Sequence, residues 1–204
     1  FAAEAARGAL RQEVLMMGSA ALDPAWRQPG LAVGATKIHL RESDLPDFDA
    51  TCARIVHSHQ TGRPVAVHCV TLAELMFALG ALQATGVRAG DRLEHAALST
   101  PEAVALVRDA GLAVVTQPHF VFERGDAYLS TLAADELAGL YRARSFVSAG
   151  VALGAGSDAP YGDADPWRSM AAAQHRLTRG GRRLDAGARL DATAALLRLY
   201  GSSA

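Results

Sequence analysis

The chain is poor in the residue types that mark several large classes of protein. Its 204 residues include two cysteines, Cys52 and Cys69, which suit a reducing cytoplasm better than a disulfide framework. Acidic and basic residues nearly cancel to a formal net charge of −1, so we expect neither nucleic acid nor a membrane surface as a partner. No apolar run approaches the roughly 18 residues of a membrane span, and no signal-peptide pattern opens the chain. We therefore expect a cytoplasmic protein, with Cys69 a small core residue.

Lysine is the scarcest of the charged residue types. The basic residues are 19 arginines and one lysine, Lys37. A genome-wide bias towards arginine would explain the surface, and one lysine left by chance is the simplest alternative. An amine can nevertheless do chemistry that a guanidinium cannot. Lys37 is therefore a candidate functional residue.

The composition otherwise describes one globular domain. Half of the residues are hydrophobic, which is ample for a core in a chain of this length, and no linker divides residues 1–204. The chain starts at Phe1 without a methionine and ends at residues 201–204 just after an apolar helical stretch. We therefore expect a piece of a longer protein.

Helical and strand patterns alternate along the chain. Helical spacing or capping signals predict helices over residues 1–17, 48–60, 71–85, 100–111 and 133–149, from Asp165 onwards and over 191–200. Short apolar runs predict strands over residues 31–40, 64–70, 92–96, 112–117 and 150–158. Strands that alternate with helices indicate βαβ units and a parallel sheet.

The spacing of polar residues at the strand ends favours a barrel over an open sheet. A (β/α)₈ barrel of about 250 residues has about 31 residues per unit. Lys37 and His68 are 31 positions apart, His68 and His95 are 27 apart, and Asp158 follows His95 by 63, or two units. The sequence predicts an α/β fold: a partial TIM barrel of about five parallel strands with flanking helices.

Candidate ligands for a metal stand at these strand ends. His68, His95 and Asp158 each follow an apolar run, and side chains at the carboxyl ends of barrel strands converge on one cleft. Imidazole and carboxylate groups suit a borderline metal such as zinc. Each residue also has a simpler explanation: a hydrogen-bonded histidine, a turn aspartate, or a lysine that extends outwards from its strand.

These segments resemble one branch of the amidohydrolase superfamily. Arg92-Leu-Glu-His95-Ala-Ala, with the strand that ends at Pro118, is similar to strands 6 and 7 of the "amidohydrolase family 3" branch, which includes N-substituted formamide deformylases. Residues 154–160, followed by 165–167, resemble its strand 8; residues 64–68 and 36–38 resemble strands 5 and 4. The likeness begins near residue 31, so it implies a fragment that carries strands 4–8 and lacks strands 1–3 and the flanking β-sandwich.

The resemblance also implies a site and an activity. His68 and His95 would be imidazole ligands of a divalent metal, which we expect to be zinc, with one or two ions. Asp158 would contact the metal and act as general base, and Lys37 would carry a carbamate that bridges two metals. Gln117 and His119 would lie near the substrate. The expected reaction is hydrolysis of an amide, a formamide or a cyclic amide by a metal-activated water.

Two features depart from the family pattern: the position of the His-x-His pair and the lack of the first strands. The family places a His-x-His pair on strand 1, whereas His57-Ser58-His59 matches those letters at the end of a helical stretch. We interpret it as a coincidental surface pair. A sheet without its first strands would expose two edges and an apolar face, so we expect a homo-oligomer or association with the missing half of the barrel.

Two other readings remain open. The chain is alternatively a catalytically inactive barrel remnant that serves as an oligomerisation or binding module. A doubly wound nucleotide-binding protein would need a Gly-x-Gly-x-x-Gly loop, and the glycine-rich run from Gly150 to Gly156 lacks that spacing.

Overall fold

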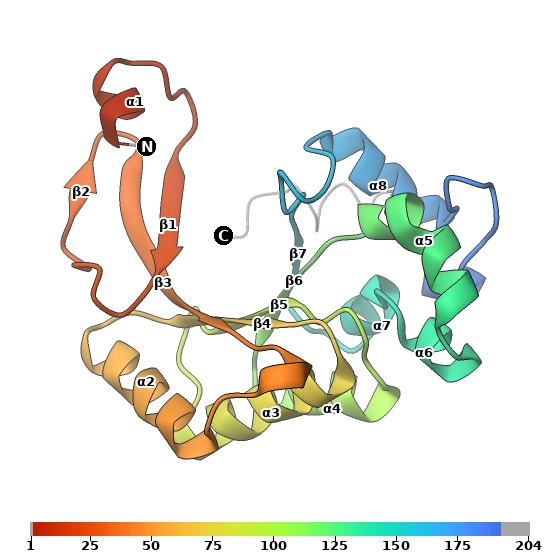
Figure 1. Cartoon of the computed structure of the whole chain (residues 1–204), viewed down its shortest axis with the longest axis horizontal. Coiled ribbons are helices and arrows are strands. Elements are labelled where there is room, and N and C mark those ends of the chain that lie inside the picture. Colours follow the sequence, from red (N-terminus) through yellow and green to blue (C-terminus); the bar gives the residue numbers. More distant parts are fainter. Residues whose placement is uncertain (1, 193–204) are drawn as a thin grey trace.

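The computed structural model describes residues 2–192 (Figure 1). Six parallel strands form a curled sheet in the order β1-β3-β4-β5-β6-β7, and the short β2 pairs antiparallel with β3. The predicted partial barrel is confirmed, with one parallel strand more than the five expected. The strands are β1 (Val14–Gly18), β2 (Arg27–Gln28), β3 (Leu31–His39), β4 (Val65–Cys69), β5 (Arg92–His95), β6 (Ala113–Thr116) and β7 (Leu153–Ala155).

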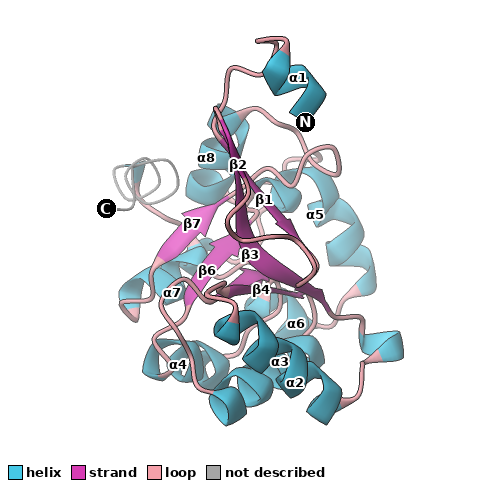
Figure 2. Ribbon diagram, turned by 90° about the vertical axis from the view of Figure 1, so that its left-hand side faces the viewer, coloured by secondary structure: helices cyan, strands magenta, loops and turns pink. Residues whose placement is uncertain are grey.

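Helices connect the strands and gather on the outer face of the sheet, where Figure 2 shows α2, α3 and α4 together. They are α1 (Ala2–Ala6), α2 (Phe48–Gln60), α3 (Leu72–Thr85), α4 (Pro101–Asp109), α5 (His119–Thr131), α6 (Ala134–Gly139), α7 (Ala143–Ser148) and α8 (Pro166–His175), with the 3₁₀ turns η1 (Glu42–Asp44) and η2 (Ala186–Ala188). Within residues 2–192, no helix combines the length and apolarity needed to cross a membrane.

Side-chain caps explain where the predicted helices begin. Asp47 accepts a hydrogen bond from the Ala50 amide at the start of α2, and Thr71 forms a capping box with Glu74 at the start of α3. Thr100 caps α4 and Asp165 caps α8, each just before a proline in the first turn. The caps of α2, α4 and α8 confirm the capping signals read from the sequence.

The helix predicted over residues 1–17 is wrong for most of its length. Only Ala2–Ala6 is helical, and Val14–Gly18 is the strand β1, which pairs parallel with β3 from Val14 opposite Leu31. The prediction was based on strong helix formers in this segment. Hydrogen bonds to a neighbouring strand override such a weak local preference for helix. A strand therefore does precede residue 31, contrary to expectation.

The single helix predicted over residues 133–149 is in fact two. Leu140 pairs with Leu98 in an isolated bridge, Tyr141 donates its amide to Ala97, and Tyr141 takes a positive φ of 46°. These tertiary contacts separate α6 from α7. Helix α5 was not predicted, and nearly all of the helix predicted over 191–200 lies outside the described residues.

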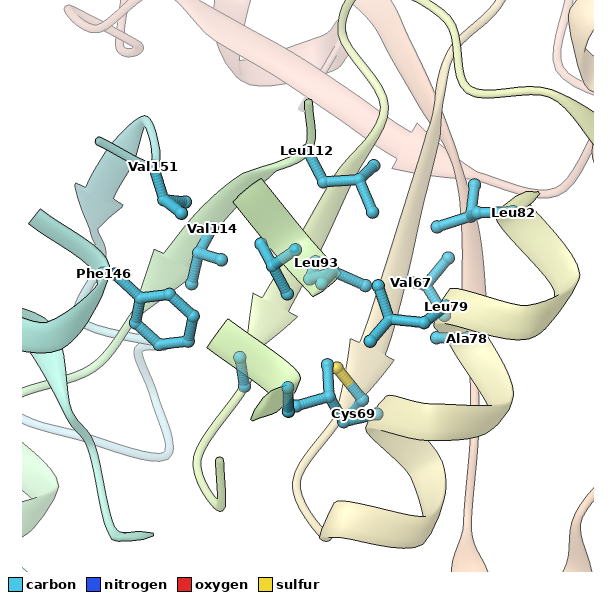
Figure 3. Close-up of a cluster of buried hydrophobic side chains, with 14 of the residues drawn as sticks. Val67, Cys69, Ala78, Leu79, Leu82, Leu93, Leu112, Val114, Phe146 and Val151 are labelled. Atoms are coloured by element: carbon cyan, nitrogen blue, oxygen red, sulfur yellow. The ribbon is translucent and has the colours of Figure 1, made fainter. Parts of the chain in front are cut away.

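The main hydrophobic core fills the space between the sheet and its outer helices. In Figure 3, Val67 of β4, Leu93 of β5 and Val114 of β6 approach Leu79 of α3 and Phe146 of α7. Cys69 is fully buried in the same cluster, as expected of a small core residue. Since residues alternate between the faces of a strand, the polar residues between these apolar ones point to the concave side.

The interpretation of His57 and His59 as a surface pair is wrong for one of them. His57 is exposed, whereas His59 is buried and its Nε2 lies 3.0 Å from a carboxylate oxygen of Asp91. Asp91 also accepts the backbone amides of Val65 and Arg88, each at 2.8 Å. The last turn of α2 faces the loop before β5, so one histidine turns inward to satisfy a buried carboxylate.

We expect Asp91→Ala to lower the free energy of unfolding by about 3 kcal/mol, because it leaves buried donors without an acceptor. Chemical denaturation measures this. Asp109→Ala is the matched control: it removes an exposed ion pair with Arg108 and should cost less than about 1 kcal/mol. Equal effects of the two substitutions would contradict a structural role for the buried pair.

Candidate active site

The candidate ligands come from neighbouring strands and meet at one edge of the sheet. Lys37 lies near the end of β3, His68 in β4 and His95 at the end of β5, while Asp158 follows β7. Because the strands are parallel, their carboxyl ends share this edge. Strands far apart in sequence therefore bring these four residues to the same mouth.

Three histidine rings form a row across the first strands of this edge. His39 stands opposite His68 in the ladder between β3 and β4, and their ring centroids are 4.0 Å apart. The ring of His95 lies 4.4 Å from that of His68. Sequence reasoning missed His39, although its position two residues after Lys37 in a strand was a usable signal, since such residues share a face.

Lys37 is partly buried among charged groups. Burial lowers the pKa of its amine most, Glu94 opposes that effect, Arg92 lowers the pKa further and Asp158 raises it. Glu94 itself forms an ion pair with Arg92 at 2.7 Å. Asp158, which follows β7, therefore lies close enough to Lys37 of β3 for the two charges to interact. Partial burial and these charged neighbours argue against the simpler alternative of a lysine that extends outwards into solvent.

The two candidate histidine ligands are held neutral. Burial, then the neighbouring His95 and His39, lowers the pKa of His68 from 6.5 to about 3. Burial also lowers the pKa of His95, against the raising effects of Asp158 and of the Gln117 side chain beside it. A metal binds the neutral form of imidazole. These side chains are therefore in the protonation state that coordination requires.

The backbone is strained at two of the candidate ligands. His95 has a φ of 71° and Asp158 a φ of 51°, both in the left-handed region that non-glycine residues rarely adopt. Such positions cost on the order of 1–3 kcal/mol each and cluster at functional sites.

Two buried polar atoms next to the ligands have no partner among residues 2–192: Oε1 of Gln117 and Nε2 of His119. The Gln117 amide nitrogen donates to the Val115 carbonyl at 3.4 Å. His119 is the buried first residue of α5 rather than a loop histidine, and its Nδ1 lies 3.1 Å from Oγ of Ser169. Burial lowers the pKa of His119 most, Glu123 raises it, Arg124 lowers it further, and Asp158 raises it. Unpartnered buried polar atoms are costly and call for an explanation such as a ligand.

The donors fit a divalent metal by their chemistry, since neutral imidazoles and a carboxylate lie at the same edge of the sheet. Their arrangement stops short of a complete site. Within residues 2–192, no group of three or more His, Cys, Asp and Glu side chains is placed to hold a metal ion.

A curled parallel half-barrel with imidazole and carboxylate groups at its carboxyl edge has its candidate residues where (β/α)₈-barrel enzymes hold their active sites. Residues 9–203 match the family model described as "Amidohydrolase family", and the chain belongs to that family. No protein with a curated description matches the chain closely enough to count as a relative.

Solved structures share this fold. An uncharacterised metal-dependent hydrolase from Pyrococcus furiosus matches 96% of this chain with a TM-score of 0.82 at 21% identity, and one from Pyrococcus horikoshii OT3 matches 86% with a TM-score of 0.75 at 23% identity. An adenosine deaminase from Xanthomonas campestris with bound zinc matches 84% with a TM-score of 0.53 at 19% identity. The chain spans 46%, 41% and 38% of these proteins, respectively.

Gly162 is the glycine whose replacement should disturb the site most directly. A Cβ there would lie 2.0 Å from Nε2 of His119 and 2.6 Å from the carbonyl oxygen of Ser157. We expect Gly162→Ala to lower the free energy of unfolding by about 1–3 kcal/mol, because a buried ring and a backbone group must both move. Chemical denaturation tests this.

Gly80→Ala in α3 is the control, because its Cβ would meet only Phe48, at 3.6 Å. Alanine is the better helix former, so this variant should be unchanged or slightly more stable. A Gly162→Ala protein as stable as the parent would show that the loop carrying Asp158 is not packed against His119.

The lowered pKa of His68 predicts a pH-dependent stability. The unfolded chain binds a proton near the ordinary value of 6.5, whereas folded His68 resists protonation down to about 3. The unfolded state therefore gains stability relative to the folded state as the pH falls through that window. In chelator-treated buffer we expect unfolding to become easier by about 1–2 kcal/mol between pH 7 and pH 5. His68→Gln should reduce the dependence of the free energy of unfolding on pH, whereas the control His57→Gln should retain it. An unchanged pH dependence in His68→Gln would show that His68 is not its source.

Proposed function

We propose that the chain is the ligand-bearing half of a metal-dependent hydrolase that cleaves C–N bonds in an amide, a formamide or a cyclic amide. One observation carries the proposal: Lys37, His68, His95 and Asp158 lie at or just beyond the carboxyl ends of parallel strands, at one edge of the sheet. Their mutual effects on pKa and the 4.4 Å between the rings of His68 and His95 support it. Membership of the amidohydrolase family points to the same chemistry.

In this proposal His68, His95 and Asp158 hold a divalent cation, which we take to be zinc. Imidazole nitrogen and carboxylate oxygen are common zinc ligands, and the similar adenosine deaminase structure is described with bound zinc. Lys37 is the candidate for a second role. Burial lowers the pKa of its amine, which favours the uncharged form that adds carbon dioxide to give a carbamate, the bridge expected between two ions.

A bound cation would supply Lewis acidity towards water and towards the amide carbonyl. The chain supplies the proton transfers and the positioning. Asp158, as general base, takes the proton released when water attacks, and as general acid it returns that proton to the departing nitrogen. Gln117 offers an unpartnered carbonyl oxygen and His119 an unpartnered ring nitrogen, so both are proposed substrate contacts.

We further propose that the open edge of β1 is covered in the cell, by the rest of the barrel or by a second copy of the chain. Leu15 and Met17 of β1 are 72% and 40% exposed, and an uncovered apolar edge strand invites pairing. The chain covers less than half of the similar hydrolases, which favours the rest of the barrel. We place the protein in the cytoplasm because of its low cysteine content.

A catalytically inactive remnant is the second candidate function. The observation in its favour is that no group of three metal-ligating side chains within residues 2–192 is placed to hold an ion. Such a chain would serve as a binding or oligomerisation module.

Metal content and hydrolysis of N-substituted formamides distinguish the two candidates. We expect the chain to hold stoichiometric metal by mass spectrometry, and His68→Ala and His95→Ala to lose it. Asp158→Asn should lower kcat by about 10²-fold to 10⁴-fold, because the proton transfer is removed.

His57→Ala is the matched control, because it removes an exposed histidine on α2. It should change neither metal content nor rate. A chain without metal and without hydrolysis would favour the remnant, and metal retained by both His68→Ala and His95→Ala would remove them as ligands.

A further inference from the structure

A cavity of about 570 Å³ lies between α5 and α8, two helices that pack against each other on the right of Figure 1. One face of α8 lines it, along a stripe that runs from Arg168 through Ala172 to His175 at helical spacing. Phe122 of α5 and Leu177, in the loop after α8, line it as well. We call this cavity the α5–α8 groove. Its volume is that of a pocket for a small organic molecule.

The floor of the α5–α8 groove is apolar. Ala172 is 5% exposed, and Phe122 and Leu177 are half-buried. Ala171 is exposed at its edge, and Trp167, one turn earlier on α8, is 69% exposed. Small alanine side chains leave the space that makes the groove, and its apolar walls favour a ligand with an apolar body.

The charged side chains that line the groove are basic. Arg168 and Arg179 line it beside His175, and no carboxylate among residues 2–192 does so. Arg168 is paired with Asp163 at 2.6 Å, so part of its charge is already offset. Arg179 has no ion-pair partner in the described part of the chain. The groove therefore presents a guanidinium that is free to pair with an anion.

Phe122 holds Arg179 at the groove in two ways. The guanidinium lies over the ring of Phe122, 5.7 Å from its centroid, and the backbone amide of Arg179 donates to the Phe122 carbonyl at 2.9 Å. A contact with the face of an aromatic ring orients a guanidinium without using its N–H donors. These donors stay available at the edge of the apolar floor.

We propose that the α5–α8 groove binds a small organic carboxylate, with its apolar body between the helices and its carboxylate on Arg179. A guanidinium presents two parallel N–H donors that match the two oxygens of a carboxylate. The basic lining disfavours a cation of the same shape. None of the four candidate metal ligands lines this groove, so the proposal does not depend on the proposed function.

Phenylacetate, phenethyl alcohol and phenethylamine test the proposal, because they share an aromatic body and end in an anion, a neutral group and a cation. NMR titration of the intact chain in chelator-treated buffer should show phenylacetate binding roughly 10-fold more tightly than the alcohol, as expected for a charge-assisted hydrogen bond. The amine should bind more weakly than the alcohol. None of the three contains an amide, so hydrolysis does not interfere.

Arg179→Gln should abolish the preference for phenylacetate over the alcohol and leave binding of the alcohol unchanged. The fold should survive this change, because the backbone bond to Phe122 does not involve the arginine side chain. Arg54→Gln is the matched control, since it removes an exposed arginine of α2, and it should keep the full preference.

Ala171→Phe tests the position of the ligand, because the added ring occupies the edge of the groove. It should weaken binding of phenylacetate and of the alcohol alike, by about 10-fold or more, through the loss of apolar surface for the ligand to bury. Ala53→Phe is the matched control on an exposed position of α2 and should bind both ligands as the parent does.

Four results would overturn the proposal: no binding of phenylacetate, equal or tighter binding of the amine, a preference that survives Arg179→Gln, or binding that survives Ala171→Phe. Analytical ultracentrifugation adds a fifth. Self-association that Ala171→Phe abolishes, in a chain that does not bind phenylacetate, would assign the groove to a second copy of the chain instead.

Discussion

The parallel hydrogen-bond ladder from β3 to β7 is the constraint on which the rest of the structure depends. Its register sets His39 beside His68 and Cys69 beside His95, and it brings residues more than 100 positions apart to a common edge. A slip of one residue in β4 would turn His68 into the core and Val67 into the cleft. The core prevents that slip, because Val65, Val67 and Cys69 are all buried against the helices.

Successive residues of each strand point alternately into the core and to the concave face of the sheet. In β5, Leu93 is buried in the core while Arg92 and Glu94 on either side form an ion pair on the concave face. The helices therefore support the sheet from outside without occupying the cleft. The cleft can then tolerate groups that are costly elsewhere, including neutral buried histidines and a left-handed backbone at His95 and Asp158.

Contacts with residues distant in sequence explain which sequence interpretations failed. Val14–Gly18 reads as the end of a helix rich in strong helix formers, yet it is a strand because β3 offers a ladder of backbone partners. His59 reads as a surface residue beside His57, yet its ring meets Asp91 from 32 positions away. His39 shares a face of β3 with Lys37, but only the ladder shows that its ring stacks on that of His68.

The sequence by itself determined the fold class, the main helices and the positions of Lys37, His68, His95 and Asp158 at strand ends, because these depend on periodicity, caps and spacing along the chain. The tertiary structure alone decided which side chains meet. The lowered pKa of His68 and the burial of the unpartnered atoms of Gln117 and His119 arise from neighbours distant in sequence. Burial and electrostatic contact are properties of that three-dimensional neighbourhood, so no local pattern encodes them.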